Sequence, residues 1–375
     1  MKKFLKDNKS AIRFIFFLFI IWRLFLFLPS FLSSIFVIKR IGFLGPIPWS
    51  NFDGVHYLSI AQHGYFQYEQ AFFPLFPFLI RCVSFITFGN YVLAGMLVVY
   101  TFLLLWLFVF YKLLLIDYKE NIVRWMLIGY LFSPTSFFFV SLYTETFFLF
   151  FIISAFLAAR KEKWILAGIC IGLASSTKFV GIFLLPALFF EFFIRYRKHT
   201  VICKKMIELV SMLFLGASGV IVYMLYLWRF YADPLFFIHA QPAFGANRSG
   251  GNIILLPQVL FRYIKIFISV SFTHYDTWIA LLEFCMFLVC LFLLCFAFYK
   301  RQVRSSYLIF SLLAVIGPTL TGSLSSIPRY ILVAFPMFIL FGSITNTKIK
   351  ICFLLLSSVL LLILTSFFLQ GYFIA

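Results

Sequence analysis

The chain has 375 residues, of which 64% are hydrophobic and only 11% are charged, and its mean hydropathy is +1.06. A soluble protein cannot bury so much apolar surface, so this composition excludes a soluble globular protein. The formal net charge of +19 does not indicate nucleic-acid binding, because the Lys and Arg residues are divided among short segments between apolar runs. We expect contacts of this charge with anionic membrane lipids and no nucleic-acid partner.

Apolar runs of about 20 residues recur along the whole chain and predict membrane-spanning helices. We therefore expect an all-α polytopic membrane protein that forms a single domain over residues 1–375. The first run follows a basic segment and has no small-residue cleavage site, which favours a retained transmembrane helix over a signal peptide. We predict about 11 helices, at 14–38, 91–111, 121–142, 143–159, 164–178, 179–194, 206–228, 276–299, 305–322, 328–345 and 351–370.

The positions of the basic residues predict how these helices are oriented. With the N-terminus inside, the predicted inward segments together hold 21 of the 31 Lys and Arg residues. Cytoplasmic loops of membrane proteins are enriched in these residues, so the asymmetry supports this orientation. It places residues 39–90 and 229–275 outside, as two large non-cytoplasmic loops. The inward segments are 1–13, 112–120 (extended to Arg124), 160–163, 195–205, 300–304 and 346–350.

The segment 72–88, FFPLFPFLIRCVSFITF, is apolar enough to cross a membrane. Its two prolines and Arg81 instead favour a helix that lies in the membrane interface. The alternative, one more span, would reverse the orientation of every later loop. We predict the interfacial helix.

The stretch Phe52–Pro77 of the first outer loop concentrates polar and ionisable side chains in an otherwise apolar chain. Charged groups are costly to place near lipid, so this concentration predicts a functional site. Asp53 fits a general base with a partly desolvated carboxylate. The alternative is that Asp53 caps a short helix beginning near Gly54. The other candidate substrate-binding residues of this stretch are His56, His63, Tyr68 and Glu69.

Two histidines of this stretch, His56 and His63, fall on one face of a predicted helix and could bind a metal together with Asp53. No His-Glu-x-x-His pattern is present, so a polar face along a substrate groove is the better interpretation. Glu69 fits a ligand for sugar hydroxyls or, alternatively, a solvated loop acid. We expect neither a metal nor another cofactor. The cysteines show no metal-ligand spacing and are interpreted as apolar helix residues; they are Cys82, Cys170, Cys203, Cys285, Cys290, Cys295 and Cys352.

Three further ionisable residues, Glu145, Lys178 and Arg329, lie where separate segments reach the outer membrane surface in this orientation. They are therefore expected in the same leaflet as Asp53. Cations at that level suit a phosphate headgroup, although ordinary snorkelling to the interface is the alternative for each cation. Weaker candidates are Arg81, Arg229, Arg248, Asp233 and Asp276.

The stretch FDGVHYLSIAQHGYFQYEQAFFPLFP resembles the first luminal loop of the PIG-V-like GPI mannosyltransferase II family, including its bacterial members. That family has, in this order, a W/F-D pair, a histidine or aromatic residue, an I-A-x-x-G-Y turn, a tyrosine–glutamate pair and an A-F-F-P-x-F-P run. The matching residues here are Phe52-Asp53, His56, Ile60-Ala61-Gln62-His63-Gly64-Tyr65, Tyr68-Glu69 and Ala71-Phe72-Phe73-Pro74-Leu75-Phe76-Pro77.

Three shorter segments are similar to the same family in the same order. SPTSFFFVSLYTETFF is similar to its S/N-P-A-x-x-F…Y-S-E-x-L-F segment and places Glu145 on the glutamate. GLASSTKFVG is similar to G-L-A-T-x-x-R-S-N-G, with Lys178 where arginine is usual and Val180 where asparagine is usual. IPRYILVAFP resembles the late P-R-Y segment, which contains Arg329.

The resemblance implies a membrane glycosyltransferase of the GT-C type, with a catalytic outer loop after the first helix and Asp53 as catalytic base. It implies inverting transfer of a sugar, with mannose favoured, from a polyprenyl-phosphate donor to a lipid, glycan or protein acceptor. A bacterial plasma membrane is the favoured location, and the endoplasmic reticulum is the alternative. The rival function is a transporter or flippase of a lipid-linked or anionic substrate. It is suggested by Arg23 and Glu283, two charges that lie deep within predicted spans.

Overall fold

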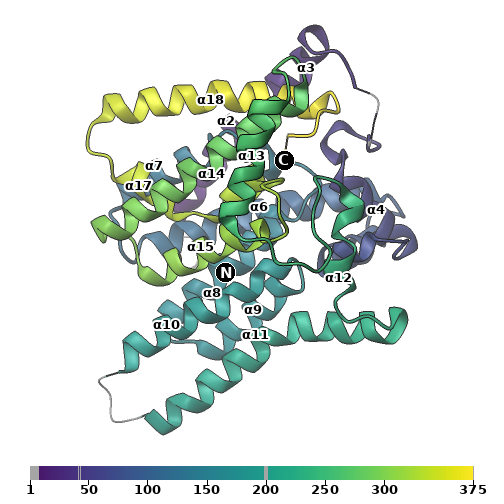
Figure 1. The fold of residues 1–375 in the computed structure, drawn as a ribbon. Helices are drawn as coiled ribbons and strands as arrows, with labels where there is room; N and C mark the ends of the chain where they lie inside the picture. The colour runs from purple at the N-terminus through teal and green to yellow at the C-terminus, as the bar shows by residue number, and fades with distance from the viewer. Residues whose placement is uncertain (1–7, 41, 43, 198–201, 375) are drawn as a thin grey trace.

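The computed structural model describes residues 8–40, 42, 44–197 and 202–374 of the chain. Within these ranges the regular secondary structure is entirely helical (Figure 1). The N-terminal half contains α2 (Lys9–Phe25), α3 (Phe27–Phe36), α4 (Asp53–His63), α5 (Leu75–Ser84), α6 (Tyr91–Leu114), α7 (Glu120–Leu131), α8 (Glu145–Arg160), α9 (Trp164–Ser175) and α10 (Leu184–Tyr196). The C-terminal half contains α11 (Ile202–Tyr231), α12 (Phe236–His239), α13 (Leu256–Ser269), α14 (Tyr275–Lys300), α15 (Ser305–Thr319), α16 (Ile327–Tyr330), α17 (Pro336–Ser343) and α18 (Thr347–Leu369). Short 3₁₀ helices are η1 (Pro48–Ser50), η2 (Glu69–Ala71), η3 (Ser136–Phe139), η4 (Phe179–Phe183), η5 (Gln241–Phe244) and η6 (Ile331–Val333).

Within the described ranges, six helical segments are long and apolar enough to cross a membrane. This agrees with the prediction of an all-α polytopic membrane protein, whereas the predicted number of about 11 spans is not established. The six segments are Lys9–Phe36, Tyr91–Leu114, Phe179–Tyr196, Lys205–Tyr231, Tyr275–Lys300 and Thr347–Leu369.

Several predicted helices are divided in the structure, and proline explains two of the breaks. The predicted helix 121–142 ends at Leu131, because Pro134 follows and cannot continue a helix. Residues 132–144 form turns and a 3₁₀ helix, and α8 starts only at Glu145. The predicted helix 328–345 is likewise broken before Pro336. Most of the first irregular segment is buried, as irregular backbone at membrane depth must be.

Three other predicted helices also differ in their bounds. The predicted helix 14–38 begins earlier and is divided at Leu26 into α2 and α3. The predicted helices 164–178 and 179–194 become α9, which stops at Ser175, and the pair η4 and α10. Within 72–88 the helix is α5, which has ten residues. Ten residues rise only ~15 Å, about half the hydrocarbon thickness, so α5 supports the predicted interfacial helix rather than a span.

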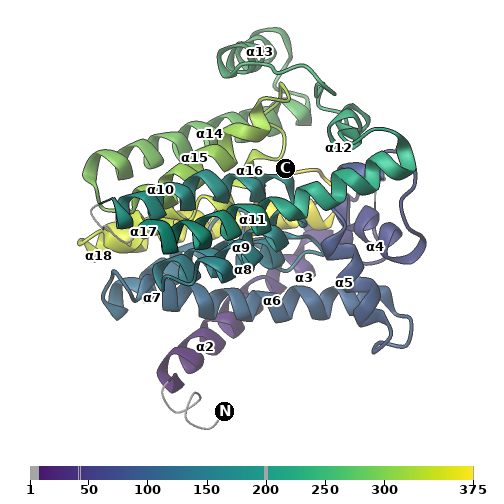
Figure 2. The same ribbon diagram turned by 90° about the horizontal axis from the view of Figure 1, so that it is seen from below.

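The long helices run side by side, and α8 lies in their centre, where it packs against α6, α9 and α10 (Figure 2). Glycines permit the close approach of α9 and α11. A Cβ atom at Gly168 would lie 2.8 Å from the Met212 Cα atom, and one at Gly172 would lie 2.6 Å from the Leu215 carbonyl oxygen. The packing therefore requires glycine at both positions.

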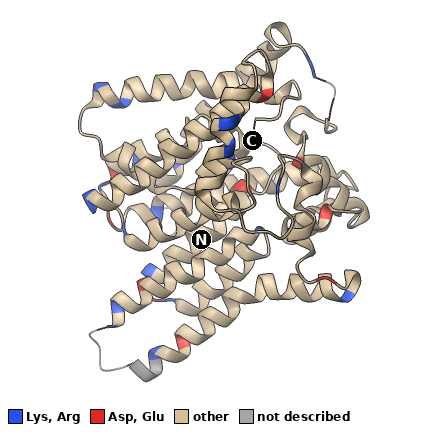
Figure 3. Ribbon diagram, viewed as in Figure 1, with Lys and Arg blue, Asp and Glu red and all other residues tan. Residues whose placement is uncertain are grey.

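The two ends of this bundle differ. At one end lie α4, α5 and α12, which belong to the two predicted outer loops (Figure 2). At the other end α14 ends and α18 begins, and Figure 3 shows Lys and Arg residues there. The structure thus groups the segments predicted to face inward, and we call this the basic end of the bundle.

Candidate functional site

Asp53 is the first residue of α4, and the backbone before it is fixed by contacts with distant segments. The side-chain amide of Asn51 donates to the Phe368 carbonyl at the end of α18, and the Asn51 carbonyl accepts from the Tyr143 hydroxyl. Gly54 packs against the Leu142 carbonyl oxygen. The N-cap of α4 is Phe52, and no side-chain hydrogen bond caps this helix, so the alternative role of Asp53 as a cap is not what the structure shows.

Instead, the Asp53 carboxylate belongs to a four-residue cluster of charges, which we call the outer cluster. Arg329 Nη1 donates to Asp53 Oδ2, and Arg329 Nε lies 3.5 Å from Glu145 Oε1. Lys178 Nζ donates to the same Glu145 oxygen at 2.6 Å. The sequence placed these four residues in one leaflet, and the structure brings their side chains into contact.

The outer cluster is largely buried. Only 1% of the Glu145 side chain is exposed, and the values for Arg329 and Asp53 are 12% and 20%. Two carboxylates and two cations compensate each other there, as buried charges must. Glu145 Oε2 is a buried acceptor for which the described part of the chain supplies no hydrogen-bond donor. It is therefore free to accept a hydrogen bond from a bound molecule or water.

Burial and neighbouring charges shift the pKa values of this cluster. Burial raises the pKa of the Asp53 carboxyl, but the charge and hydrogen bond of Arg329 outweigh it, with help from His56 and Arg248, and the net pKa lies below its usual 3.8. Asp53 is therefore a carboxylate at neutral pH. Burial lowers the pKa of the Lys178 amine, and Glu145 opposes this only in part.

Glu69 and His56 form a second pair in the first outer loop. His56 Nδ1 lies 3.1 Å from Glu69 Oε1, and Glu69 Oε2 accepts from the Phe66 amide at 3.0 Å. The alternative of a solvated loop acid is wrong, because Glu69 is buried. Burial raises its pKa, but hydrogen bonds from His56 and the Phe66 amide prevail, and the net pKa is lowered. This pair ties the loop to α4.

His63 and Tyr68 lie away from the outer cluster. Tyr68 is exposed and has a positive φ of 68°. The His63 ring lies 6.1 Å from that of Phe66. Across the described ranges, no hydrogen bond or ion pair joins either residue to Asp53, Glu145, Lys178 or Arg329.

Arg248, a weaker candidate in the sequence, lies close to the outer cluster. Its guanidinium donates to the side-chain oxygens of Gln241, Ser325 and Ser326 at 3.2–3.3 Å. Its charge contributes to the lowered pKa of Asp53. Among the described residues no carboxylate lies within ion-pair distance of it. No local sequence signal singles out Arg248, since its contacts with Ser325 and Ser326 form only when the second outer loop packs against the segment before α16.

The other weaker candidates have structural partners or lie apart. Arg81 Nε donates to the Ala61 carbonyl at 2.6 Å and so satisfies the last turn of α4. Asp233 pairs with His239 at 2.6 Å. Asp276 is exposed at the start of α14, and the Arg229 guanidinium lies over the Phe230 ring.

Arg23 and Glu283, the two charges that suggested the rival transport function, also have local partners. Glu283 accepts a hydrogen bond from Tyr263, whose hydroxyl in turn accepts from the Leu324 amide at 3.0 Å. Glu283 therefore anchors the segment that leads to Arg329. Arg23 lies over the Trp49 ring, 5.0 Å from its centroid. Neither arrangement needs a transport pathway.

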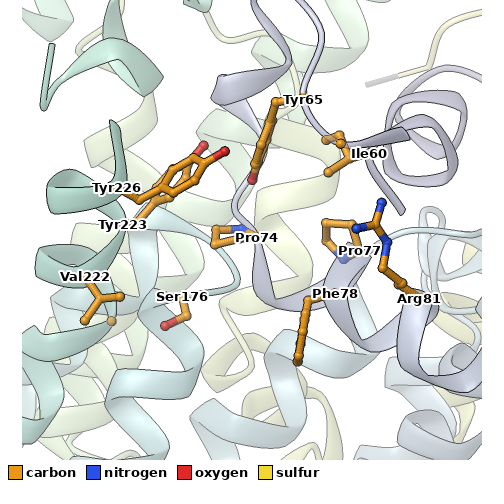
Figure 4. A pocket seen from close by; sticks show the side chains of 12 residues that line it. Ile60, Tyr65, Pro74, Pro77, Phe78, Arg81, Ser176, Val222, Tyr223 and Tyr226 are labelled. Carbon is orange, nitrogen blue, oxygen red and sulfur yellow. The ribbon is translucent and has the colours of Figure 1, made fainter. Parts of the chain in front are cut away.

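A cavity of about 410 Å³ lies between α4, α5 and α11 (Figure 4). Tyr65, Tyr223 and Tyr226 form one wall, and Arg81 lies at the opposite side. The outer-cluster residues do not line this cavity, but Ser176 does, two residues before Lys178. The lining residues Phe78 and Val222 are exposed, so the cavity opens at an apolar part of the bundle surface.

Comparisons of the chain with protein-family models, with curated proteins and with solved structures gave no match. The resemblance to the PIG-V-like family therefore stays a prediction from the sequence. Among the residues that the structure describes, no group of three or more His, Cys, Asp and Glu side chains is placed to hold a metal ion.

Proposed function

We propose that this protein is a GT-C-type membrane glycosyltransferase, acting at the non-cytoplasmic face of a membrane, with a bacterial plasma membrane favoured. It transfers a sugar, with mannose favoured, from a polyprenyl-phosphate donor to a hydroxyl of a lipid, glycan or protein acceptor. The observation that carries this proposal is the convergence of Asp53, Glu145, Lys178 and Arg329 from four separate segments. Buried ion pairs add little to stability, so such a cluster near one membrane surface favours a chemical role.

The proposed chemistry assigns the proton transfer to Asp53. Its carboxylate takes the proton of the acceptor hydroxyl while the acceptor oxygen bonds to the anomeric carbon. The bond between that carbon and the donor phosphate oxygen breaks, and its electron pair leaves with the phosphate. Attack opposite the leaving group inverts the configuration at the anomeric carbon. The step needs no oxidant, metal or other cofactor.

The cations beside Asp53 are suited to the charge that grows on the leaving phosphate. Arg329 bridges Asp53 and Glu145, and Lys178 pairs with Glu145, so both cations lie within one contact of the proposed base or of its neighbour. Arg248 reaches the same region without a carboxylate partner among the described residues. The unpartnered Glu145 Oε2 is positioned to accept a hydrogen bond from a substrate hydroxyl.

The cavity beside the outer cluster supports a lipid-linked substrate. Its tyrosine wall and its opening at Phe78 and Val222 suit a hydrocarbon chain that enters from the bilayer. Ser176 connects it to the segment that carries Lys178 (Figure 4). A water-soluble sugar donor would not need such an opening.

The experiment measures transfer of labelled mannose from polyprenyl-phosphate-mannose to a cell-lipid extract by the purified protein in detergent. Asp53→Asn should lower the transfer rate ~100- to 10,000-fold, the range typical of general-base catalysis. The matched control is Asp276→Asn, which removes an exposed carboxylate at the same end and should leave the rate unchanged. Both variants are compared with the wild type for thermal unfolding, so that loss of fold is recognised.

Undiminished transfer by a folded Asp53→Asn variant would refute the assignment. The rival transporter or flippase predicts no transfer in detergent, because transport needs a sealed compartment and sugar transfer does not. The same measurement therefore separates the two functions.

A further inference from the structure

A second cavity, of about 570 Å³, lies at the basic end of the bundle, far along the helices from the outer cluster. It is enclosed by the end of α10, the end of α14 and the start of α15. One part of its wall is apolar and includes Phe190, Ile194 and Phe298. Ile194 and Phe298 are also exposed on the outside of the bundle, so the cavity borders the hydrocarbon.

The polar part of the wall contains a carboxylate that already has partners. Glu191 accepts hydrogen bonds from Arg304 at 3.0 Å and from the Ser306 hydroxyl at 2.6 Å. Arg304 also contacts Asp117, which is bound by Arg160. These two carboxylates and two guanidinium groups balance each other.

Two further cations add positive charge beyond these pairs, one lining the cavity and one beside it. Arg301 lines the cavity, and Lys300 Nζ lies over the ring of Tyr299, which also lines it. In the described part of the chain, no carboxylate forms an ion pair with Arg301 or Lys300. The cavity therefore combines a surplus positive charge with an apolar wall that faces the membrane.

We propose that this cavity binds the phosphodiester headgroup of an anionic glycerophospholipid, whose acyl chains lie along Phe298 and Ile194. The surplus cations neutralise the phosphate, and the exposed apolar side chains receive the chains. A free phosphate would use only the cations, and a zwitterionic lipid would bring its own positive charge to them. Since the predicted inward loops form this end, the lipid belongs to the cytoplasmic leaflet. This site does not depend on the proposed sugar transfer.

The test uses the purified full-length protein in a non-ionic detergent and native mass spectrometry. Phosphatidylglycerol and phosphatidylcholine with the same acyl chains are added in turn, and inorganic phosphate is added as a competitor. The variant is Lys300→Gln combined with Arg301→Asn. Arg301 has a φ of 51°, a region that Asn tolerates, so this change removes the charge without backbone strain. The matched control is Lys348→Gln, an exposed cation at the same end that does not line the cavity.

We expect the wild type to retain phosphatidylglycerol in preference to phosphatidylcholine. The double variant should bind phosphatidylglycerol more weakly by about fivefold for each cation removed, the effect typical of a basic residue beside an anionic lipid surface. Lys348→Gln should bind it as the wild type does.

Equal retention of the two lipids by the wild type would overturn the proposal, as would undiminished retention of phosphatidylglycerol by the double variant. An equal loss in Lys348→Gln would show that general surface charge is responsible, and displacement of the lipid by millimolar inorganic phosphate would show a free-phosphate site. Either result also overturns it. Sugar transfer by the double variant is measured separately and should be unchanged, so failure here does not affect the proposed function.

Discussion

The two ends of α8 carry two ion-pair clusters of equal charge and very different surroundings. Glu145 at its first residue belongs to the outer cluster, and Arg160 at its last residue joins Asp117, Arg304 and Glu191 in what we call the inner network. Sixteen residues separate these ends by ~24 Å. Each cluster holds two carboxylates and two cations.

The difference lies in exposure and in what the pairs connect. The exposed fractions of the outer-cluster side chains run from 1% for Glu145 to 20% for Asp53, and those of the inner network run from 8% for Arg160 to 39% for Arg304. The inner network joins the ends of loops and helices near water, where a charged group has a small desolvation penalty. The outer cluster removes four charges from water, which has a large desolvation cost and little net gain in stability. The comparison is in line with a structural role for the inner network and supports the proposed chemical role of the outer cluster.

The largest expected effect comes from removing the carboxylate shared by two cations. Glu145→Ala leaves Lys178 and Arg329 buried with one carboxylate between them, so we expect a loss of unfolding free energy of about 3 kcal/mol or more. The control is Glu208→Ala, which breaks the partly exposed pair with Lys205 and should cost less than ~1 kcal/mol. Thermal unfolding in detergent compares the two variants. Equal shifts of the unfolding temperature in the two variants would contradict the expected difference between buried and exposed ion pairs.

A somewhat smaller loss of unfolding free energy is expected when residue 329 keeps its positive charge but loses the guanidinium group, which can donate in two directions. Arg329 contacts both Asp53 and Glu145, and a lysine ammonium at that position reaches only one of them. Arg329→Lys should therefore lower the unfolding free energy by about 1–3 kcal/mol, the cost of a buried acceptor that loses its donor. In a Glu145→Ala background the same substitution should cost less, because the contacts are coupled. Full additivity of the two changes would contradict the bridging geometry.

The inner network should lose less unfolding free energy than the outer cluster when one of its carboxylates is removed. Asp117→Asn removes a partly exposed carboxylate from Arg160 and Arg304, and Glu191 still pairs with Arg304. We expect a loss of about 1 kcal/mol or less and an unchanged rate of sugar transfer. A loss as large as that of Glu145→Ala would show that both ends are equally sensitive.

The smallest expected effect is the change in unfolding temperature when the pH is lowered to moderately acidic values. The pKa of the Asp53 carboxyl is lowered in the folded protein, and so is that of Asp117, for which burial acts upward and Arg160 downward. A carboxyl with a depressed folded pKa stabilises the fold above its unfolded value of about 3.8, and this stabilisation is lost as the pH falls through the folded pKa. The unfolding temperature should thus change little between pH 6 and pH 4 and fall below pH 4. A steep fall already between pH 6 and pH 5 would exclude these two carboxyls as the cause.

Much of the site's outline was predictable from the sequence, because charges in so apolar a chain are conspicuous. The ends of the apolar runs and the distribution of basic residues place Asp53, Glu145, Lys178 and Arg329 in one leaflet. The roles of Arg248 and Glu283 were not predictable. Arg248 approaches the site from the second outer loop through Ser325 and Ser326, and no periodicity encodes contacts between residues so distant in the chain.

The sequence by itself determined that this is a helical membrane protein and which end of each long helix carries the basic residues, since hydropathy and charge act locally and add along the chain. Only the tertiary structure decided where helices break and which charges meet. Helix α7 ends at Leu131, residues 132–144 do not continue it, and α8 begins at Glu145 in the centre of the bundle. The pairing of Glu145 with Lys178 and Arg329 follows from that packing, because a buried charge is stable only where the fold brings an opposite charge to it.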